Sequence, residues 1–459
     1  MYNFFNFKKF NDKYLITNDM GRYMFIDKDI FKSLVFGYEI KDELESQLHK
    51  NYFIFDDEYS FSESCKYALR DSKNYLFEST VLHIFVLTNS CNMKCIYCQA
   101  KDEEHINKSY MNKEIAEKSV NIALSSPSKC LTFEFQGGEP LCNFDILKHI
   151  VLYTEENKRD KIVSYNLVSN LLLANDEILD FLKYYNINIS TSLDGDKRIH
   201  DYNRLLLNGD GSFDYLVGKI EKFKNKNIEL SAIQTTTKKS LAYSKQIIDS
   251  YVDLGFSSIF LRPLTRLGTA ARIWDEIGYT AEEFIEFYSK SLDYIMELNK
   301  QGVHIKEIHA LIFLKKILHG VAENYMELRS PCGASIGQLA YFYDGNIFTC
   351  DEGRMLYEMG NDAFKLGNVF DDTYDTIIKS PTCKTTCIAS LLESQLNCSD
   401  CVYQAYCGTC PVLNLAQDND LFFKNISSFR CKVYKGILDK LFLILNDGKH
   451  LNILERWVE

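Results

Sequence analysis

Apolar, β-branched runs alternate with helical-period segments along the middle of the chain, from about residue 83 to about residue 302. In the helical segments apolar residues recur every three or four positions, which is the spacing of one buried helix face. The pattern contains six strand–helix units, with strands predicted over residues 83–90, 130–139, 161–170, 186–195, 228–237 and 257–264, and helices over residues 112–124, 143–157, 175–185, 214–226, 240–255 and 280–302. The strands are short and almost continuously apolar, as in parallel sheets buried on both faces. Repeated βα units favour a parallel α/β barrel or an open sheet, and we expect a partial (β/α)6 barrel.

The segments on either side of this repeat have different patterns. Residues 1–80 contain three short strand-like runs, over residues 5–10, 13–19 and 21–27, followed by two stretches with helical spacing. They predict a small α+β domain with a winged-helix-like character. After about residue 330 the periodicity gives way to cysteine-rich, loop-like sequence, and residues 437–457 close the chain as a predicted helix. We therefore expect three domains, at residues 1–80, 81–325 and 326–459.

Charge and hydropathy narrow the possible partners. The formal net charge is −11 and no cluster of Lys and Arg is present, which argues against nucleic acid as a partner. No run of 18 apolar residues occurs, so no membrane span is predicted, and the first residues do not resemble an export signal. The sequence predicts a cytoplasmic protein. Its fifteen cysteines are then expected to be reduced, and their grouping within residues 91–98 and 332–431 points to metal binding.

Polar and glycine-rich clusters follow the first four predicted strands. In parallel α/β folds the chemistry gathers at the carboxyl ends of the strands. The four clusters are the cysteine loop of Cys91, Cys95 and Cys98, the run Gln136-Gly137-Gly138-Glu139-Pro140, the pair Ser169-Asn170, and the run Ser192-Leu193-Asp194-Gly195. An ordinary turn would explain any one of them, but four at the same rim predict a functional site.

The first of these loops, TNSCNMKCIYCQA, spaces its cysteines as C-x3-C-x2-C, with Tyr97 before the last of them and GGEP after the second strand. This combination resembles the radical S-adenosylmethionine (SAM) enzymes. In that family three cysteines hold a [4Fe–4S] cluster, and its fourth iron is left open for the amino and carboxylate groups of SAM, as catalytic metal sites keep an open position. The resemblance implies that an electron from the cluster cleaves the sulfonium C–S bond. The resulting 5′-deoxyadenosyl radical would take a hydrogen atom from the substrate.

The same resemblance implies roles for other residues at the rim. The backbone at Gly137, Gly138 and Glu139 would receive the SAM amino group, and Tyr97 would pack near adenine. Asn170, Ser192 and Asp194 would lie near the ribose, and Arg204 would bind the SAM carboxylate, for which a guanidinium can provide two hydrogen bonds. Two alternatives remain open from the residues themselves. The three cysteines could form a zinc site with a distant histidine such as His105, and Asn170 and Ser192 could be ordinary turn or capping residues.

A second group of cysteines lies in the last third of the chain. Its layout resembles the SPASM extension of peptide-modifying radical SAM enzymes, which binds two auxiliary [4Fe–4S] clusters. The resemblance implies one cluster on Cys398, Cys401, Cys407 and Cys431, and another on Cys332, Cys350 and Cys410. The chain departs from the family pattern in two ways. Only two residues, Gly408 and Thr409, separate Cys407 from Cys410, where the family usually has three, and no cysteine occurs between Cys142 and Cys332. The second cluster would thus have an open iron or take Cys387 or Cys383 as a ligand. Two zinc ribbons are the alternative.

A narrower resemblance is to the radical SAM maturases of His-Xaa-Ser-type peptide systems, based on YLITNDMGRYMFID, CDEGRMLYEMG and CVYQAYCGTCPV. It implies modification of a ribosomally made precursor peptide, by a crosslink (thioether, C–C or C–O) or an epimerisation. Residues 1–80 would bind the leader peptide by strand addition or serve only as a packing extension. A flavodoxin- or ferredoxin-type donor would supply electrons. The alternatives to a peptide-modifying enzyme are an anaerobic sulfatase-maturating enzyme and a non-catalytic zinc scaffold.

Cys65, Cys130 and Cys142 lie outside both cysteine groups and are expected to be ordinary buried cysteines.

Overall fold

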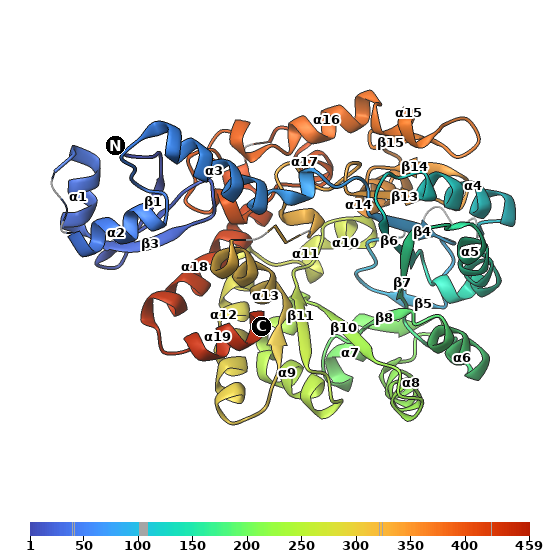
Figure 1. Cartoon of the computed structure of the whole chain (residues 1–459). Helices are drawn as coiled ribbons and strands as arrows, with labels where there is room; N and C mark the ends of the chain where they lie inside the picture. Colours follow the sequence, from blue (N-terminus) through green and yellow to red (C-terminus); the bar gives the residue numbers. More distant parts are fainter. Residues whose placement is uncertain (39, 41, 101–108, 321, 324, 424) are drawn as a thin grey trace.

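The computed structural model describes residues 1–459 except 39, 41, 101–108, 321, 324 and 424 (Figure 1). At its centre is a ten-stranded sheet with the strand order β12-β11-β10-β8-β7-β6-β4-β13-β14-β15. All six predicted strands belong to its parallel part: β4 (Leu82–Val86), β6 (Cys130–Gln136), β7 (Ile162–Val168), β8 (Asn188–Ser192), β10 (Leu230–Thr235) and β11 (Ser258–Arg262). A short strand, β12 (Lys306–Glu307), pairs in parallel with β11. The predicted parallel α/β fold is confirmed.

The predicted helices of the repeat are also present. They are α4 (Lys113–Leu124), α5 (Phe144–Asn157), α6 (Asp176–Tyr184), α8 (Phe213–Asn225), α9 (Ser244–Asp253) and α12 (Ala281–Lys300). Local signals set where several of them begin. The side chains of Asn112 and Asn175 accept hydrogen bonds from backbone N–H groups in the first turns of α4 and α6, and Thr280 and Glu283 form a capping box on α12. Such caps satisfy N–H groups that have no partner inside the helix.

The two faces of the sheet differ, which the apolar strand pattern did not indicate. In β6, Phe133 and Phe135 are fully buried, whereas Glu134 and Gln136, which point the other way, are half-buried. The same alternation runs through the neighbouring strands β7, β8 and β10. The expectation of burial on both faces was therefore wrong for these strands. One face packs against the helices, and the other is a polar inner face that borders a cavity.

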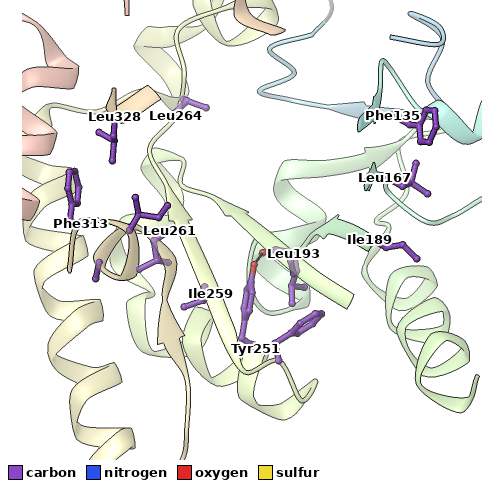
Figure 2. Packing of buried hydrophobic residues seen from close by; sticks show 14 of the residues in the cluster. Phe135, Leu167, Ile189, Leu193, Tyr251, Ile259, Leu261, Leu264, Phe313 and Leu328 are labelled. Atoms are coloured by element: carbon purple, nitrogen blue, oxygen red, sulfur yellow. Dashed lines mark hydrogen bonds between the residues drawn. The ribbon is translucent and has the colours of Figure 1, made fainter. Parts of the chain in front are cut away.

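Figure 2 shows part of the packing on the buried face. Phe135, Leu167 and Ile189 come from three neighbouring strands of the sheet, and all three lie in one large hydrophobic cluster. Tyr251 of α9 joins them and donates a hydrogen bond from its hydroxyl to the backbone oxygen of Leu193 at 2.7 Å. Burying this apolar face stabilises the sheet, at about 25 cal/mol per Å² removed from water. The strand ends are thereby held in a fixed relation to one another.

The C-terminal region extends the same sheet. Its strands β13 (Gln338–Tyr341), β14 (Asn346–Phe348) and β15 (Lys365–Asn368) continue the sheet beyond β4, with β13 parallel to β4 and the others antiparallel. The sequence had predicted loop-like structure here. Strands of three or four residues are too short for an alternating pattern to be visible in the sequence. Because β13 pairs with β4, the cysteine-rich region is fixed beside the strand that leads into the first cysteine loop.

Helices of the C-terminal region complete this part of the chain. They are α14 (Asp351–Glu358), α15 (Tyr374–Ile378), α16 (Pro381–Ala389), α17 (Pro411–Asp418), α18 (Phe429–Asp447) and α19 (Leu451–Val458). The predicted closing helix is in fact two helices, because Gly448 adopts the left-handed conformation, with φ of 72°, and ends α18. Long α18 packs along α12 of the repeat. The remaining short elements are β5 (Met93–Cys95), α7 (Lys197–Asn203), β9 (Arg204–Leu206), α10 (Gly268–Arg272), α11 (Trp274–Ile277) and α13 (Ile308–Leu314).

The N-terminal segment forms its own small sheet. Strands β1 (Asn6–Phe10), β2 (Lys13–Thr17) and β3 (Tyr23–Asp27) are antiparallel, in that order, and are followed by α1 (Lys28–Phe36), α2 (Asp42–Lys50) and α3 (Glu58–Ser72). This segment, blue in Figure 1, packs against the C-terminal region. Tyr23 and Phe25 contact the ring of Phe442, and the hydroxyl of Tyr406 donates to the backbone oxygen of Gly21 at 3.0 Å. None of the helices that the structure describes has the length and apolar composition to span a bilayer.

Candidate active site

The first cysteine loop is supported by a small antiparallel ladder. Strand β5 pairs with β9, so that Cys95 lies opposite Arg204, and the backbone N–H of Ile96 donates to the oxygen of Asn203 at 2.9 Å. Nη1 of Arg204 lies 3.8 Å from Sγ of Cys95. Two segments more than 100 residues apart in the sequence are thus joined side by side. The pairing fixes a guanidinium beside one of the three thiols.

The glycine run after β6 packs directly against the segment that leads into the cysteine loop. The N–H of Gly138 donates to the oxygen of Thr88, and the N–H of Glu139 donates to the oxygen of Ser90, both at 2.8 Å. A Cβ on Gly137 would lie 2.3 Å from the oxygen of Thr88, and one on Gly138 would lie 2.4 Å from the oxygen of Ser90. Only glycine permits this approach at both positions. The close contact fixes the loop that carries the thiols.

We expect Gly138→Ala to destabilise the protein by about 2 kcal/mol or more, because the added methyl would meet a backbone oxygen that cannot move easily. The midpoint of urea unfolding measures the effect. Gly218→Ala is the matched control, since a Cβ at this position in α8 meets nothing within 4 Å. The control should be neutral or stabilising, by about 0.5–1 kcal/mol, because alanine is the better helix former. Equal midpoints for the two variants would contradict the role given to Gly138.

Glu139 joins the ends of the second and third strands. Its buried carboxylate accepts hydrogen bonds from the N–H of Leu141 at 3.0 Å, the hydroxyl of Ser169 at 2.7 Å and the N–H of Asn170 at 2.8 Å. Burial raises the pKa of this carboxyl, and the three hydrogen bonds act in the opposite direction. Nδ2 of Asn170 in turn donates to Oδ1 of Asn92, inside the cysteine loop, at 2.7 Å. Glu139, Ser169, Asn170 and the cysteine loop therefore form one connected network.

Asp194, which the resemblance places near the SAM ribose, has several protein partners of its own. Its side chain is fully buried and accepts hydrogen bonds from the hydroxyl of Tyr97 at 2.7 Å, Nδ2 of Asn203 at 3.1 Å and the N–H of Thr235 at 3.2 Å. Nε of Arg204 lies 3.3 Å from the same carboxylate. The guanidinium of Arg204 also lies 5.3 Å from the ring centre of Tyr97. Asp194 thus holds Tyr97 and Arg204 in place.

A cavity of about 220 Å³ opens between the cysteine loop and the inner face of the sheet. It brings together all three thiols and every other predicted cofactor residue except Asp194. The predicted residues in its wall are Cys91, Cys95, Tyr97, Cys98, Gly137, Gly138, Glu139, Asn170, Ser192 and Arg204. The strand-end rule predicted a site at this rim, and the structure brings the predicted residues together there. The sequence reasoning missed Arg262, which also lines the cavity and could have been found because it ends the sixth predicted strand.

The charges in this cavity fit a bound cationic centre. Burial raises the pKa of Cys91, and the charges of Glu139 and Cys95 raise it further. Burial also raises the pKa of Cys95 to about 11, although the guanidinium of Arg204 acts against the increase. Three half-buried thiols that repel one another as thiolates are stabilised in that form by iron, which is the chemistry of a cluster ligand set. The donor set fits a cluster in which one iron has no thiolate.

The cysteines of the C-terminal region form two spatial groups. In the first, burial raises the pKa of Cys407 to about 12, and the charges of Cys431, Cys401 and Cys398 also raise it. In the second, burial raises the pKa of Cys350, and the charges of Glu352, Cys410 and Cys332 raise it further. The cysteines that act on Cys407 and on Cys350 are those that the resemblance implied for each cluster. We call Cys398, Cys401, Cys407 and Cys431 the distal group, and Cys332, Cys350 and Cys410 the proximal group.

Cys387 lies beside the proximal group but has a partner of its own. It sits on α16, where hydrogen bonding to Cys383 raises its pKa, and the charge of Cys332 is a further cause of the increase. The end of α16 contacts the same loop, since the N–H of Cys332 donates to Oγ of Ser390 at 3.1 Å. Cys387 is therefore within electrostatic reach of one proximal thiol.

Three cysteines lie outside the groups described above. Cys65 is buried, Cys142 is half-buried, and Cys130 is exposed, which corrects the expectation that all three are buried. His105, the residue considered as a zinc ligand, lies outside the described residues. Within the described part of the chain, no three His, Cys, Asp or Glu side chains form a group that could hold a single metal ion. In a four-iron cluster each thiolate binds a different iron atom, so its ligands stand further apart than those of one ion.

A second cavity, of about 50 Å³, lies next to the first, and residues Arg262, Pro263, Leu264 and Thr265 line both. Its charged side chains form a network around Glu327. Nη2 of Arg262 donates to Oε1 of Glu327 at 3.0 Å, and Nη1 of Arg430 lies 3.0 Å from its Oε2. Burial alone would raise the pKa of Glu327, but the two guanidiniums lower it to about 2. The carboxylate is therefore ionised at neutral pH.

The middle of the chain matches a family model. Residues 85–237, a segment that contains the cysteine loop and the GGEP run, match the model described as the radical SAM superfamily. The chain is 31% identical over 177 residues to the uncharacterised protein MJ0907 of Methanocaldococcus jannaschii, covering 38% of this chain and 60% of that protein. It is 24% identical over 328 residues to a cysteine-type anaerobic sulfatase-maturating enzyme of Clostridium novyi, covering 70% of this chain and 84% of the relative.

Two solved structures have a similar fold. Native anSMEcpe with bound AdoMet superposes with a TM-score of 0.69 at 19% identity, covering 82% of this chain and 99% of that one. Streptococcus suis SuiB bound to the precursor peptide SuiA gives a TM-score of 0.56 at 15% identity, covering 93% of this chain and 97% of that one. Together with the site described above, these matches show that residues 85–237 are a radical SAM segment and that the chain is an enzyme related to that superfamily. The family implies a [4Fe–4S] cluster and SAM as cofactors.

Proposed function

We propose that this enzyme modifies a ribosomally made precursor peptide by removing a hydrogen atom from it, and that the product is a crosslinked or epimerised peptide. The single observation that carries the proposal is the cavity shared by three cysteine thiols, the glycine run and Arg204, which has a second cavity beside it. The structural neighbour SuiB, which was solved with its precursor peptide, supports a peptide substrate.

In this proposal Cys91, Cys95 and Cys98 hold the cluster, which with SAM would supply the hydrogen-abstracting radical. The residues of this chain bind and orient SAM. Arg204, fixed by β9 and by Asp194, would bind the SAM carboxylate, and the backbone oxygens of the glycine run would receive its amino group. Tyr97 would pack near adenine, and Asn170 and Ser192 would lie near the ribose. The buried carboxylate of Asp194 has a positioning role here, because three donors and Arg204 already surround it.

The two cysteine groups of the C-terminal region are proposed as auxiliary cluster sites. The four distal thiols are enough to close one cluster, and the three proximal thiols leave one position to fill. We propose Cys387 for that position, because its charge interacts with that of Cys332. Residues 326–459 would then be an auxiliary-cluster domain attached to the SAM domain of residues 81–325. A flavodoxin- or ferredoxin-type protein would donate the electrons.

The role of Cys387 can be tested without measuring activity. We expect Cys387→Ala to change the electron paramagnetic resonance (EPR) signal of one auxiliary cluster and to lower the bound iron below that of the unmodified protein. Cys383→Ala is the matched control, because Cys383 lies one helical turn away on α16 and hydrogen-bonds to Cys387. It should keep the full iron content. The same loss of iron in both variants would mean that α16 has only a packing role.

The N-terminal segment is proposed to bind the leader part of the peptide. Its three-stranded sheet has β1 and β3 as outer strands, and an outer strand can pair with an extended peptide through backbone hydrogen bonds. The likeness to SuiB takes in 93% of this chain, against 82% for anSMEcpe, which supports a role related to precursor peptides.

No disulfide joins any of the fifteen cysteines, all of which the structure describes, and this supports a reducing, cytoplasmic setting.

A second candidate is an anaerobic sulfatase-maturating activity. The observation that favours it is the alignment with the Clostridium novyi enzyme, which extends over 84% of that enzyme. The two candidates differ in their protein substrate. A short peptide gene beside the gene for this chain would favour the first, and a sulfatase gene the second.

The experiment that tests the proposal is anaerobic incubation of the reconstituted enzyme with SAM, a reductant and the short peptide encoded beside its gene. Release of 5′-deoxyadenosine together with a loss of two hydrogens from the peptide mass would support crosslinking. An unchanged mass with deuterium uptake from heavy water would support epimerisation. An unaltered peptide, combined with conversion of a cysteine or serine in a sulfatase-derived peptide to formylglycine, would favour the second candidate and overturn the first.

A further inference from the structure

The second cavity lies between the SAM site and the proximal cysteine group. On one side it shares residues 262–265 with the first cavity. On the other side its wall includes Glu352, two residues after Cys350, and Arg430, one residue before Cys431. The charge of Arg430 acts on the thiols of Cys410 and Cys332. A group that entered this cavity would therefore lie close to the reacting part of a peptide in the first cavity.

The titratable groups that line the second cavity include both signs of charge. They are two guanidiniums, Arg262 and Arg430, and two carboxyl groups, Glu327 and Glu352. Glu327 is paired with both arginines and also accepts a hydrogen bond from the hydroxyl of Tyr434 at 3.3 Å. A further charge of either sign would lose its hydration and would face a like charge as well as an opposite one in such a lining. The lining therefore favours an uncharged ligand.

Two polar groups of the lining still have hydrogen-bonding capacity. The carboxylate of Glu352 receives no hydrogen bond from another side chain among the described residues, apart from the contact with its own backbone. Arg262 uses Nη2 for Glu327, and its side chain is 32% exposed toward the cavities. A guanidinium has five N–H donors, so Arg262 can donate to a ligand while it stays paired. One acceptor and one donor thus border the same small space.

The volume limits the size of the ligand. About 50 Å³ is less than a quarter of the 220 Å³ of the first cavity. It suits the end of a small side chain and not that of a large one. A hydroxyl group both donates and accepts a hydrogen bond. It can pair with the carboxyl of Glu352 in either protonation state, and it carries no charge.

We propose that the second cavity is a specificity subsite for a small hydroxyl side chain, serine or threonine, next to the residue of the peptide that is attacked. The hydroxyl donates to Glu352 and accepts from Arg262, while its carbon atoms contact the apolar residues Leu264 and Val433 of the lining. This proposal rests on the proposed peptide-modifying function and adds to it a chemical requirement on the substrate.

The test uses the reconstituted enzyme with SAM and capped tripeptides of the form acetyl-Gly-Xaa-Gly-amide, with affinities measured by ligand-observed NMR titration. Threonine and valine as Xaa have the same shape and differ by the hydroxyl. We expect the threonine peptide to bind about tenfold more tightly, because valine leaves a buried carboxylate without its hydrogen bond. Lysine and glutamate peptides should bind no better than the valine peptide. In Glu352→Gln the preference for threonine over valine should fall to about threefold or less.

Glu358→Gln is the matched control, since Glu358 lies on the same helix, α14, and does not line the cavity among the described residues. It should keep the tenfold preference for threonine. Equal binding of the threonine and valine peptides to the unmodified enzyme, or a preference for a charged peptide, would overturn the subsite. Cleavage of SAM by the unmodified enzyme without peptide is measured in parallel. If SAM is cleaved and no preference is seen, the subsite alone fails. If SAM is not cleaved, the proposed function fails and the subsite falls with it.

Discussion

Cys95→Ala is expected to abolish the formation of 5′-deoxyadenosine from SAM. Cys95 is central to the first cysteine loop, because β5 pairs it with Arg204 and its charge interacts with that of Cys98. Two thiols cannot replace three in holding a four-iron cluster whose fourth iron must stay open. Deoxyadenosine is measured by chromatography after anaerobic incubation with SAM and dithionite. We expect less than about one per cent of the unmodified rate, as for other removed groups that act as a unit.

Cys130→Ala is the control for this experiment. Cys130 begins β6 and is exposed, away from the cavity lining. It should keep the full rate of deoxyadenosine formation. The auxiliary sites should still bind iron in Cys95→Ala, so the variant is expected to remain brown while it loses SAM cleavage. Undiminished cleavage by Cys95→Ala would contradict the assignment of this loop.

The second large effect is expected for Arg204→Gln, and it has two parts. The substitution removes the ion-pair partner of the buried carboxylate of Asp194, and an unpaired buried charge costs about 3–5 kcal/mol of folding free energy. It also removes the proposed partner of the SAM carboxylate, so the Kd for SAM should rise by about tenfold or more. The midpoint of thermal unfolding measures the first part. Equilibrium dialysis with labelled SAM measures the second.

A double variant separates the two parts. In Arg204→Gln combined with Asp194→Asn, no charge is left unpaired, so much of the lost stability should return, whereas the affinity for SAM should stay low. Arg198→Gln is the control for a lost arginine, because its side chain is 53% exposed and lies on α7, just before β9. If the double variant recovered both stability and SAM binding, Arg204 would have only a structural role.

Local signals in the sequence were enough to predict the repeat and a candidate site at its strand ends. The first four strands of the repeat are each followed within a few residues by a polar cluster, so the periodic pattern and the strand-end rule together indicated Cys95, Gly138 and Asn170, whereas Arg204 was implied by the family resemblance. The division of the C-terminal cysteines into two groups was also implied by the resemblance. These features depend on residues that are close in the chain, or on a rule that holds for the whole fold class.

Features that depend on contacts between distant residues could not be predicted. The sequence did not show that Asp194 is buried next to Tyr97 and Asn203, where β5 pairs with β9. The second cavity joins Arg262 of the barrel to Arg430 of α18, which are separated by well over 100 residues. The polar inner face of the sheet was hidden by the mixed composition of each short strand. In each case the missing information was which segments pack together.

The most direct test of the central idea is an EPR spectrum of the dithionite-reduced, oxygen-free enzyme before and after SAM is added. The result does not require the sulfur atom of SAM to bind the iron. If the thiols of the first loop leave one iron open to SAM, the signal of one cluster should change its g-values on addition, and this change should be absent in Cys95→Ala. A spectrum of fully loaded, unmodified enzyme that is the same with and without SAM would contradict the account.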